Sequence, residues 1–77
     1  LEKEHVQTMF EILLSMANTK DKEIRQGVGW ASKTTAKFHP DIIELYKKDI
    51  QNTALVANWF RKKIEIGLNR NNYAKRN

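Results

Sequence analysis

The sequence predicts an all-α protein of about four antiparallel helices arranged as two helix pairs. Apolar residues recur at intervals of three and four along most of the 77 residues, which is the spacing of amphipathic helices. Short polar segments separate four such stretches, and short connections make successive helices antiparallel neighbours. Hydrophobic residues make up 40% of the chain and charged residues 30%, which is typical of a soluble globular domain.

The first helix is predicted from about residue 5 to residue 17. Its apolar positions follow the helical period: Val6, Met9, Phe10, Leu13, Met16 and Ala17. The polar segment 18–21 interrupts this pattern. Either Thr19 or Asp21 is expected to cap the next helix, because both side chains can accept hydrogen bonds from its first free N–H groups.

The second helix is predicted from about residue 22 to residue 37. Its core-facing stripe spans about 80° of the helix surface at 100° per residue: Ile24, Val28, Ala31, Thr35 and Phe38. Gly27 lies at the edge of this stripe, where close approach of a neighbouring helix would explain it. The spacing gives no reason for Gly29.

A single proline in the middle of the chain is expected to separate two helices. Because the residue before a proline is displaced from helical geometry, His39 is expected to end the second helix and Pro40 to begin the third. The third helix is predicted to reach Gln51 and the fourth to run from Thr53 to Leu68. Residues 69–77 are polar and are expected to form a cap and a loose tail.

The two predicted pairs, 5–37 and 40–68, give a period near 38 residues. That period lies in the range of HEAT and armadillo units, so the pairs are expected to form part of an α-solenoid. Two units are fewer than such arrays usually need, which predicts that residues 1–77 are one helical fragment of a longer repeat protein, with upstream repeats or self-association covering its ends. An independent four-helix bundle is the alternative architecture.

The net charge of +5 is concentrated near the end of the chain. Residues 57–77 contain six Lys or Arg and one Glu, whereas the two signs balance over residues 1–56. This distribution favours an anionic partner, nucleic acid before membrane. No residue pattern predicts a catalytic site, a metal site or a cofactor, since cysteine is absent and His5 and His39 are far apart.

Trp30 is the most conspicuous candidate for a functional residue. It projects away from the core stripe of its helix, beside Gln26, Lys33 and Lys37. It either packs against a helix outside this sequence or forms a binding surface, where the ring contacts a nucleic acid and the lysines meet phosphates. Trp59, in contrast, is predicted to belong to the core.

The segment from Ile24 to Ala31, followed by the segment from Ala36 to Asp41, resembles the C-terminal HEAT-like repeats of AlkD-like DNA alkylation repair proteins. The Gly-x-Gly-Trp-Ala core at 27–31 carries this resemblance, and residues 56–68 look like the closing helix of one branch of the family. Lys33 stands where the family usually has an arginine, and the preceding Ser32 where it usually has a leucine.

The resemblance implies an α-solenoid with a basic concave surface that binds alkylated duplex DNA. Active members are monofunctional glycosylases that release N3- and N7-alkylated purines without a metal or other cofactor. Their catalytic aspartate belongs to an earlier repeat, so this chain is expected to supply DNA binding in a cytoplasmic repair enzyme and to be inactive alone. The expected DNA-binding residues are Trp30, Lys33, Lys37, Gln26, Arg25, Arg61 and Lys63.

Two other functions remain open. A non-catalytic HEAT-like scaffold would use Trp30 to bind a protein partner. A DNA-binding module of the helix-turn-helix type is less favoured, because no helix combines a basic N-terminal face with a tight glycine turn before it.

Overall fold

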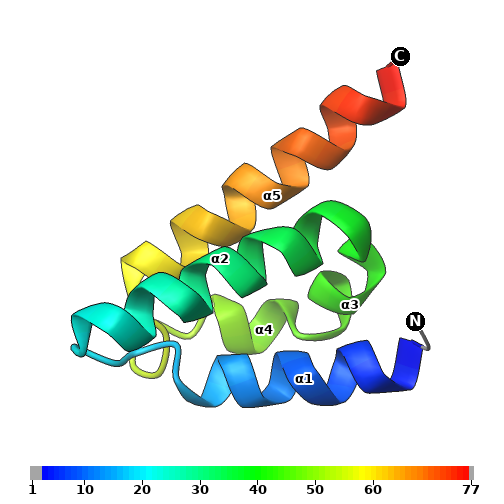
Figure 1. Ribbon diagram of the computed structural model, residues 1–77. Coiled ribbons are helices and arrows are strands. Elements are labelled where there is room, and N and C mark those ends of the chain that lie inside the picture. Colours follow the sequence, from blue (N-terminus) through cyan, green and yellow to red (C-terminus); the bar gives the residue numbers. More distant parts are fainter. Residues whose placement is uncertain (1–2, 77) are drawn as a thin grey trace.

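A computed structural model describes the backbone of residues 3–76 and the side chains of residues 3–70. All regular structure in this part of the chain is helical. The five helices are α1 (Lys3–Ser15), α2 (Lys22–Phe38), α3 (Pro40–Leu45), α4 (Lys47–Ile50) and α5 (Asn58–Arg76) (Figure 1). Within the described residues, no helix has the combination of length and apolar character that crossing a bilayer requires.

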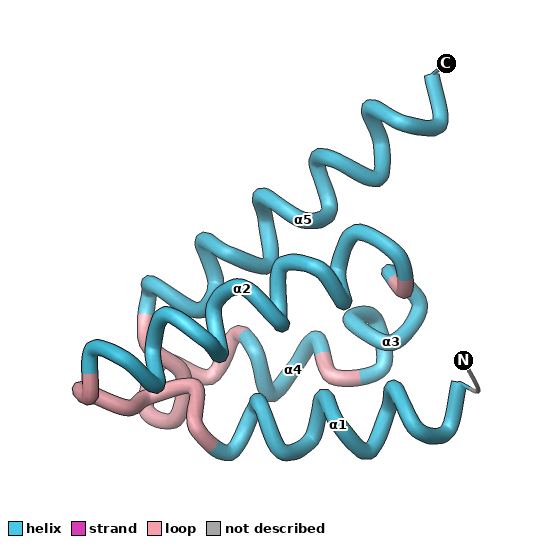
Figure 2. Tube along the Cα trace, in the orientation of Figure 1, coloured by secondary structure: helices cyan, strands magenta, loops and turns pink. Residues whose placement is uncertain are grey.

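The helices form two layers around one hydrophobic core. Helices α2 and α5 lie side by side, and α1, α3 and α4 pack beneath them in the view of Figures 1 and 2. Every helix contributes to the core, whose buried apolar residues are Val6, Phe10, Leu13, Ala17, Val28, Ala36, Ile42, Ile43, Ile50, Val56, Phe60 and Ile64. At its centre the Phe10 ring lies 5.5 Å from that of Tyr46 and 6.1 Å from that of Phe60.

Asp21 is the residue that caps α2. Its carboxylate accepts hydrogen bonds of 3.0 Å from the backbone N–H groups of Glu23 and Ile24. Thr19 acts one step earlier, because its hydroxyl accepts a bond from the N–H of Asp21. Of the two predicted caps, Asp21 therefore bonds to the free N–H groups at the start of α2, and Thr19 holds Asp21 in place.

The predicted third helix is divided in two. Tyr46 separates α3 from α4 with φ −106° and ψ 16°, outside the helical range. Its ring packs on Phe10, and its hydroxyl donates a hydrogen bond of 2.5 Å to Glu11 and accepts one from Gln7, both on α1. The contacts with α1 accompany the break, which the apolar spacing of this segment does not reveal.

The predicted start of the fourth helix at Thr53 is wrong, because residues 51–57 form a turn and α5 begins at Asn58. The Asn52 side chain accepts a bond from the N–H of Ala54, a local bond that competes with helix formation. The N–H of Ala57 then bonds to the carbonyl of Ala17 at 3.1 Å, which ties this turn to the end of α1.

The prediction of a loose tail is wrong for residues 69–76, which continue α5 to Arg76. Extending an existing helix needs no new nucleation, so a polar sequence can continue it. The final position of the predicted tail, residue 77, lies outside the described residues.

The buried face of α2 is displaced by about 80° from the predicted stripe. Gly29, Ser32 and Ala36 are buried against α5, whereas Ile24 and Phe38 are exposed by 43% and 62% of their surface. The spacing of apolar residues predicts that the larger side chains of α2 face the core, but α5 packs so closely that small residues are buried there instead.

Glycines mark where α2 and α5 meet. A Cβ atom on Gly67 would lie 2.2 Å from the carbonyl oxygen of Lys33, and one on Gly29 would lie 3.3 Å from Cγ of Lys63. A Cβ on Gly27 would have no atom within 4 Å. The expectation that a close helix explains Gly27 is therefore wrong; the close approach occurs at Gly29 and Gly67.

Candidate nucleic-acid interface

The outward face of α2 carries the stripe formed by Gln26, Trp30, Lys33 and Lys37, here called the α2 stripe. These four positions span about 60° of the helix surface. They lie between the side of α2 that contacts α5 and the side that contacts α1. Trp30 exposes 64% of its surface, although its ring is among the largest apolar groups in the chain. The helical period thus predicted its exposure correctly.

Trp30 also borders an apolar groove of about 250 Å³ between α1 and α2. Met9 of α1 and Phe38 at the end of α2 line the same groove, and both are exposed. The Nζ atom of Lys37 lies 5.0 Å from the centre of the Phe38 ring. The indole therefore stands at the boundary between a cationic stripe and an apolar groove.

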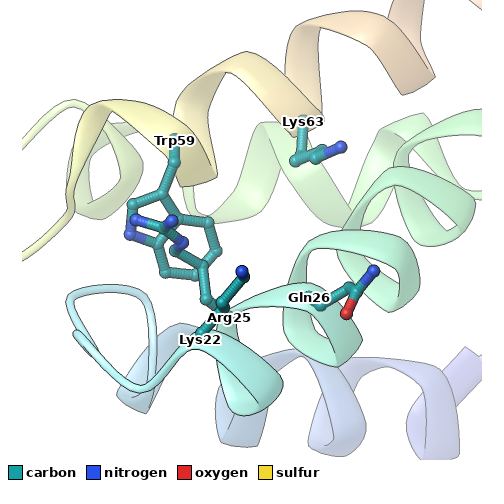
Figure 3. A pocket seen from close by; sticks show the side chains of 5 residues that line it. All are labelled: Lys22, Arg25, Gln26, Trp59 and Lys63. Atoms are coloured by element: carbon teal, nitrogen blue, oxygen red, sulfur yellow. The ribbon is translucent and has the colours of Figure 1, made fainter.

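A second groove, of about 390 Å³, lies between the N-terminal half of α2 and the first turns of α5 (Figure 3). Its lining side chains, here called the α2–α5 groove, are Lys22, Arg25, Gln26, Trp59 and Lys63. The guanidinium carbon of Arg25 lies 5.9 Å from the centre of the Trp59 ring, within range of a cation–π interaction. Trp59 is half-buried and packs against the core, as predicted, but one side of its ring forms a wall of this groove.

Arg61 points to a different part of the molecule. Its guanidinium donates to the carbonyls of Ile50 and Val56 and to the side chain of Asn58, so it fastens the 51–57 turn to α5. The seven expected DNA-binding residues therefore fall into three sets: Trp30, Lys33 and Lys37 on the α2 stripe, Arg25 and Lys63 in the α2–α5 groove with Gln26 common to both, and Arg61 at the turn.

Sequence reasoning missed two members of the groove. Lys22 is not among the residues expected to bind DNA, and Trp59 is expected only in the core. The pairs 25 and 59, 29 and 63, and 33 and 67 are each 34 positions apart, and the structure brings all three together. The side chains within each pair differ, so the sequence carries no repeat signal at this separation that would have indicated the groove.

Within residues 3–70, the two groups whose pKa is shifted lie in the other layer. Lys3 and Asp41 form a salt bridge of 2.6 Å, and this hydrogen bond lowers the pKa of the Asp41 carboxyl. The bond from Tyr46 to Glu11 raises the pKa of the phenol, with smaller contributions from desolvation. Neither Asp41 nor Tyr46 lines the α2–α5 groove or the groove beside Trp30.

The two grooves beside the α2 stripe differ in the chemistry of their lining side chains. The α2–α5 groove is lined by three cations, one amide and an indole ring, whereas the groove between α1 and α2 is lined mainly by apolar side chains with two threonines and His39. Among the described residues, no three His, Asp or Glu side chains gather as metal ligands would. No family model, curated protein or solved structure matches the chain.

Proposed function

We propose that this chain binds duplex DNA through the α2 stripe, as part of a longer repeat protein related to the AlkD-like DNA alkylation repair family. The observation that carries the proposal is the exposure of Trp30, at 64%, on the same helix face as Lys33 and Lys37. An exposed ring between cations can make apolar or stacking contact with a nucleic acid while the ammonium groups meet phosphates.

The arrangement of α2 and α5 supports the HEAT-like part of the proposal. The two helices run in the same direction, because contacts advance together from 25 and 59 to 33 and 67 (Figure 1). Helices in equivalent positions of successive solenoid repeats lie side by side in this way. On this interpretation, α1 with α2 is one repeat, α3 and α4 with α5 is the next, and α2 and α5 line the DNA-binding side.

The proposed contribution of this chain to repair is positioning rather than catalysis. Departure of an alkylated base requires stabilisation of developing positive charge, which a carboxylate would provide. The two grooves that flank the α2 stripe are lined by no carboxylate. That carboxylate would belong to an upstream repeat of the parent protein.

Fluorescence anisotropy with a short labelled duplex tests the proposal. Contacts with about three phosphates predict that log affinity falls with log salt concentration with a slope of about −2.7. A Lys33→Ala/Lys37→Ala variant should reduce the steepness of that slope, and Trp30→Ala should weaken binding by about 1 kcal/mol or more. Absence of binding at about 50 mM salt, or binding unchanged by all three substitutions, would overturn the proposal.

A protein-binding scaffold is the second candidate, and the groove between α1 and α2 favours it. Trp30, Phe38 and Met9 expose 64%, 62% and 43% of their surfaces around that groove. A contiguous exposed apolar surface of this kind is typical of a site that another protein covers. The scaffold predicts that Trp30→Ala abolishes partner binding and that the double lysine variant retains it.

A further inference from the structure

The α2–α5 groove concentrates positive charge from two helices. Lys22 and Arg25 enter it from the first turns of α2, and Lys63 enters from α5 (Figure 3). The other two lining residues, Gln26 and Trp59, are uncharged, so no carboxylate lines the groove. Among the side chains that the structure describes, none forms a salt bridge with these three cations. The groove therefore presents three positive charges that no carboxylate neutralises within residues 3–70.

Two of these cations are held in position by packing. Arg25 stands over the Trp59 ring, and that ring packs edge-on against the buried Phe60 at 5.9 Å. The Lys63 side chain passes over Gly29, where the absence of a Cβ leaves room for its methylene groups. A cation whose side chain is already ordered loses less conformational entropy when it binds an anion than a freely moving one.

The groove adjoins the α2 stripe at Gln26, but Arg25 in the groove and Lys37 at the far end of the stripe cannot contact one phosphate. Arg25 and Lys37 are twelve residues apart on one helix, which at 1.5 Å per residue is about 18 Å. Phosphates on one DNA strand advance by about 3.4 Å along the duplex axis, so this separation corresponds to about five of them. The groove would therefore act as a separate contact on the same duplex.

We infer that the α2–α5 groove is a phosphate-binding subsite, in which Arg25 and Lys63, with Lys22 at the edge, hold the DNA backbone at a second point. This inference rests on the proposed DNA-binding function and assigns to Trp59 a role as the platform that orients Arg25. An arginine fork can pair two oxygens of one phosphate, whereas lysine contributes a point charge. Gln26 can donate a further hydrogen bond from its amide.

The first test compares salt dependence in three variants. Arg25→Gln/Lys63→Gln should make the slope of log affinity against log salt less steep by about 0.9, the contribution of the one phosphate held in the subsite. The control, Lys47→Gln/Lys48→Gln, removes the same charge from exposed positions on α4, in the other layer, and should leave the slope nearly unchanged. Circular dichroism establishes that each variant retains its helices. Equal slopes for the two double variants would overturn the inference.

The second test uses Trp59 as a reporter. The sequence has two tryptophans, so a Trp30→Phe variant leaves Trp59 as the only one. Sodium tripolyphosphate should cause a saturable change in Trp59 emission, because pairing of Arg25 with phosphate alters the charge beside the ring. The change should disappear when Arg25→Gln is added to that variant. An emission spectrum indifferent to tripolyphosphate, together with an unaltered salt slope, would exclude the subsite.

The two tests separate this inference from the function on which it rests. If tripolyphosphate alters Trp59 emission but no duplex binds, the groove binds phosphate and the DNA-binding proposal fails. If the duplex binds with a slope that responds to Lys33 and Lys37 but not to Arg25 and Lys63, the DNA-binding proposal stands and the subsite is wrong.

Discussion

Replacing Gly67 with alanine probes the packing that brings α2 and α5 together. The added Cβ would lie 2.2 Å from the Lys33 carbonyl oxygen and 2.7 Å from the Ala36 Cβ. Both neighbours are fixed parts of α2, one of them backbone, so neither can rotate away. Helix α5 must move outward, and the core contacts of Phe60 and Ile64 would loosen with it.

The size of the effect follows from two opposing terms. Overpacking of this kind typically costs about 1–3 kcal/mol, and a clash with backbone belongs at the upper end. Alanine recovers up to about 1 kcal/mol because it is a better helix former than glycine. We expect Gly67→Ala to lower the free energy of unfolding by about 2 kcal/mol, which is about 8–16 °C in Tm for a domain of this size.

The other two glycines provide matched controls for the same substitution. Gly27→Ala meets no atom within 4 Å and should stabilise the protein by about 0.5–1 kcal/mol. Gly29→Ala meets the flexible Lys63 side chain at 3.3 Å, so its stability should change little while Lys63 is displaced from the α2–α5 groove. Urea unfolding followed by circular dichroism measures all three. If Gly67→Ala proves as stable as Gly27→Ala, α5 does not approach α2 at this residue.

Three further predictions concern the core, the cap of α2 and a titrating phenol. Phe60→Ala should cost about 3–5 kcal/mol, because the ring is fully buried, and calorimetry should show a protein that is largely unfolded at 37 °C. Asp21→Ala should cost about 1 kcal/mol in urea unfolding, whereas Asp21→Asn should retain most of the cap. Tyr46 should ionise above its ordinary value of 10.0, because its hydroxyl donates to Glu11, and absorbance of tyrosinate in a Tyr73→Phe background measures this. The folded state holds the Tyr46 proton more tightly than the unfolded state does. The stabilisation is therefore present below pH 10 and is lost as the pH rises through the higher pKa of the folded protein. An unshifted Tyr46 midpoint would contradict the hydrogen bond to Glu11.

The helical class and most of α1 and α2 could be predicted because their apolar residues follow the helical period over several turns. The break at Tyr46 could not, since it accompanies contacts with Gln7 and Glu11 that are distant in sequence. The late start of α5 had a local signal, the Asn52 side chain that accepts a hydrogen bond from the backbone N–H of Ala54, which the apolar pattern of residues 53–56 obscured.

The candidate site could likewise be predicted only in part. The α2 stripe lies on one helix, so spacing alone places Trp30 beside Lys33 and Lys37. The α2–α5 groove needs two helices, and its formation depends on small residues at 29 and 67 that hydrophobic spacing treats as gaps. Arg61 was grouped with its basic neighbours, whereas its hydrogen bonds to Ile50 and Val56 give it a structural role at the turn.

The separation of 34 residues between contacting positions of α2 and α5 has a consequence for how the chain folds during synthesis. At about 5–20 residues per second, a ribosome needs about 2–7 s to add the residues between Lys33 and Gly67. A helix can form within about a microsecond, so the residues of α2 wait seconds for α5, which covers Val28 and Ala36 in the folded protein. During that interval the nascent chain exposes part of its own core, and it is then most susceptible to chaperones and proteases.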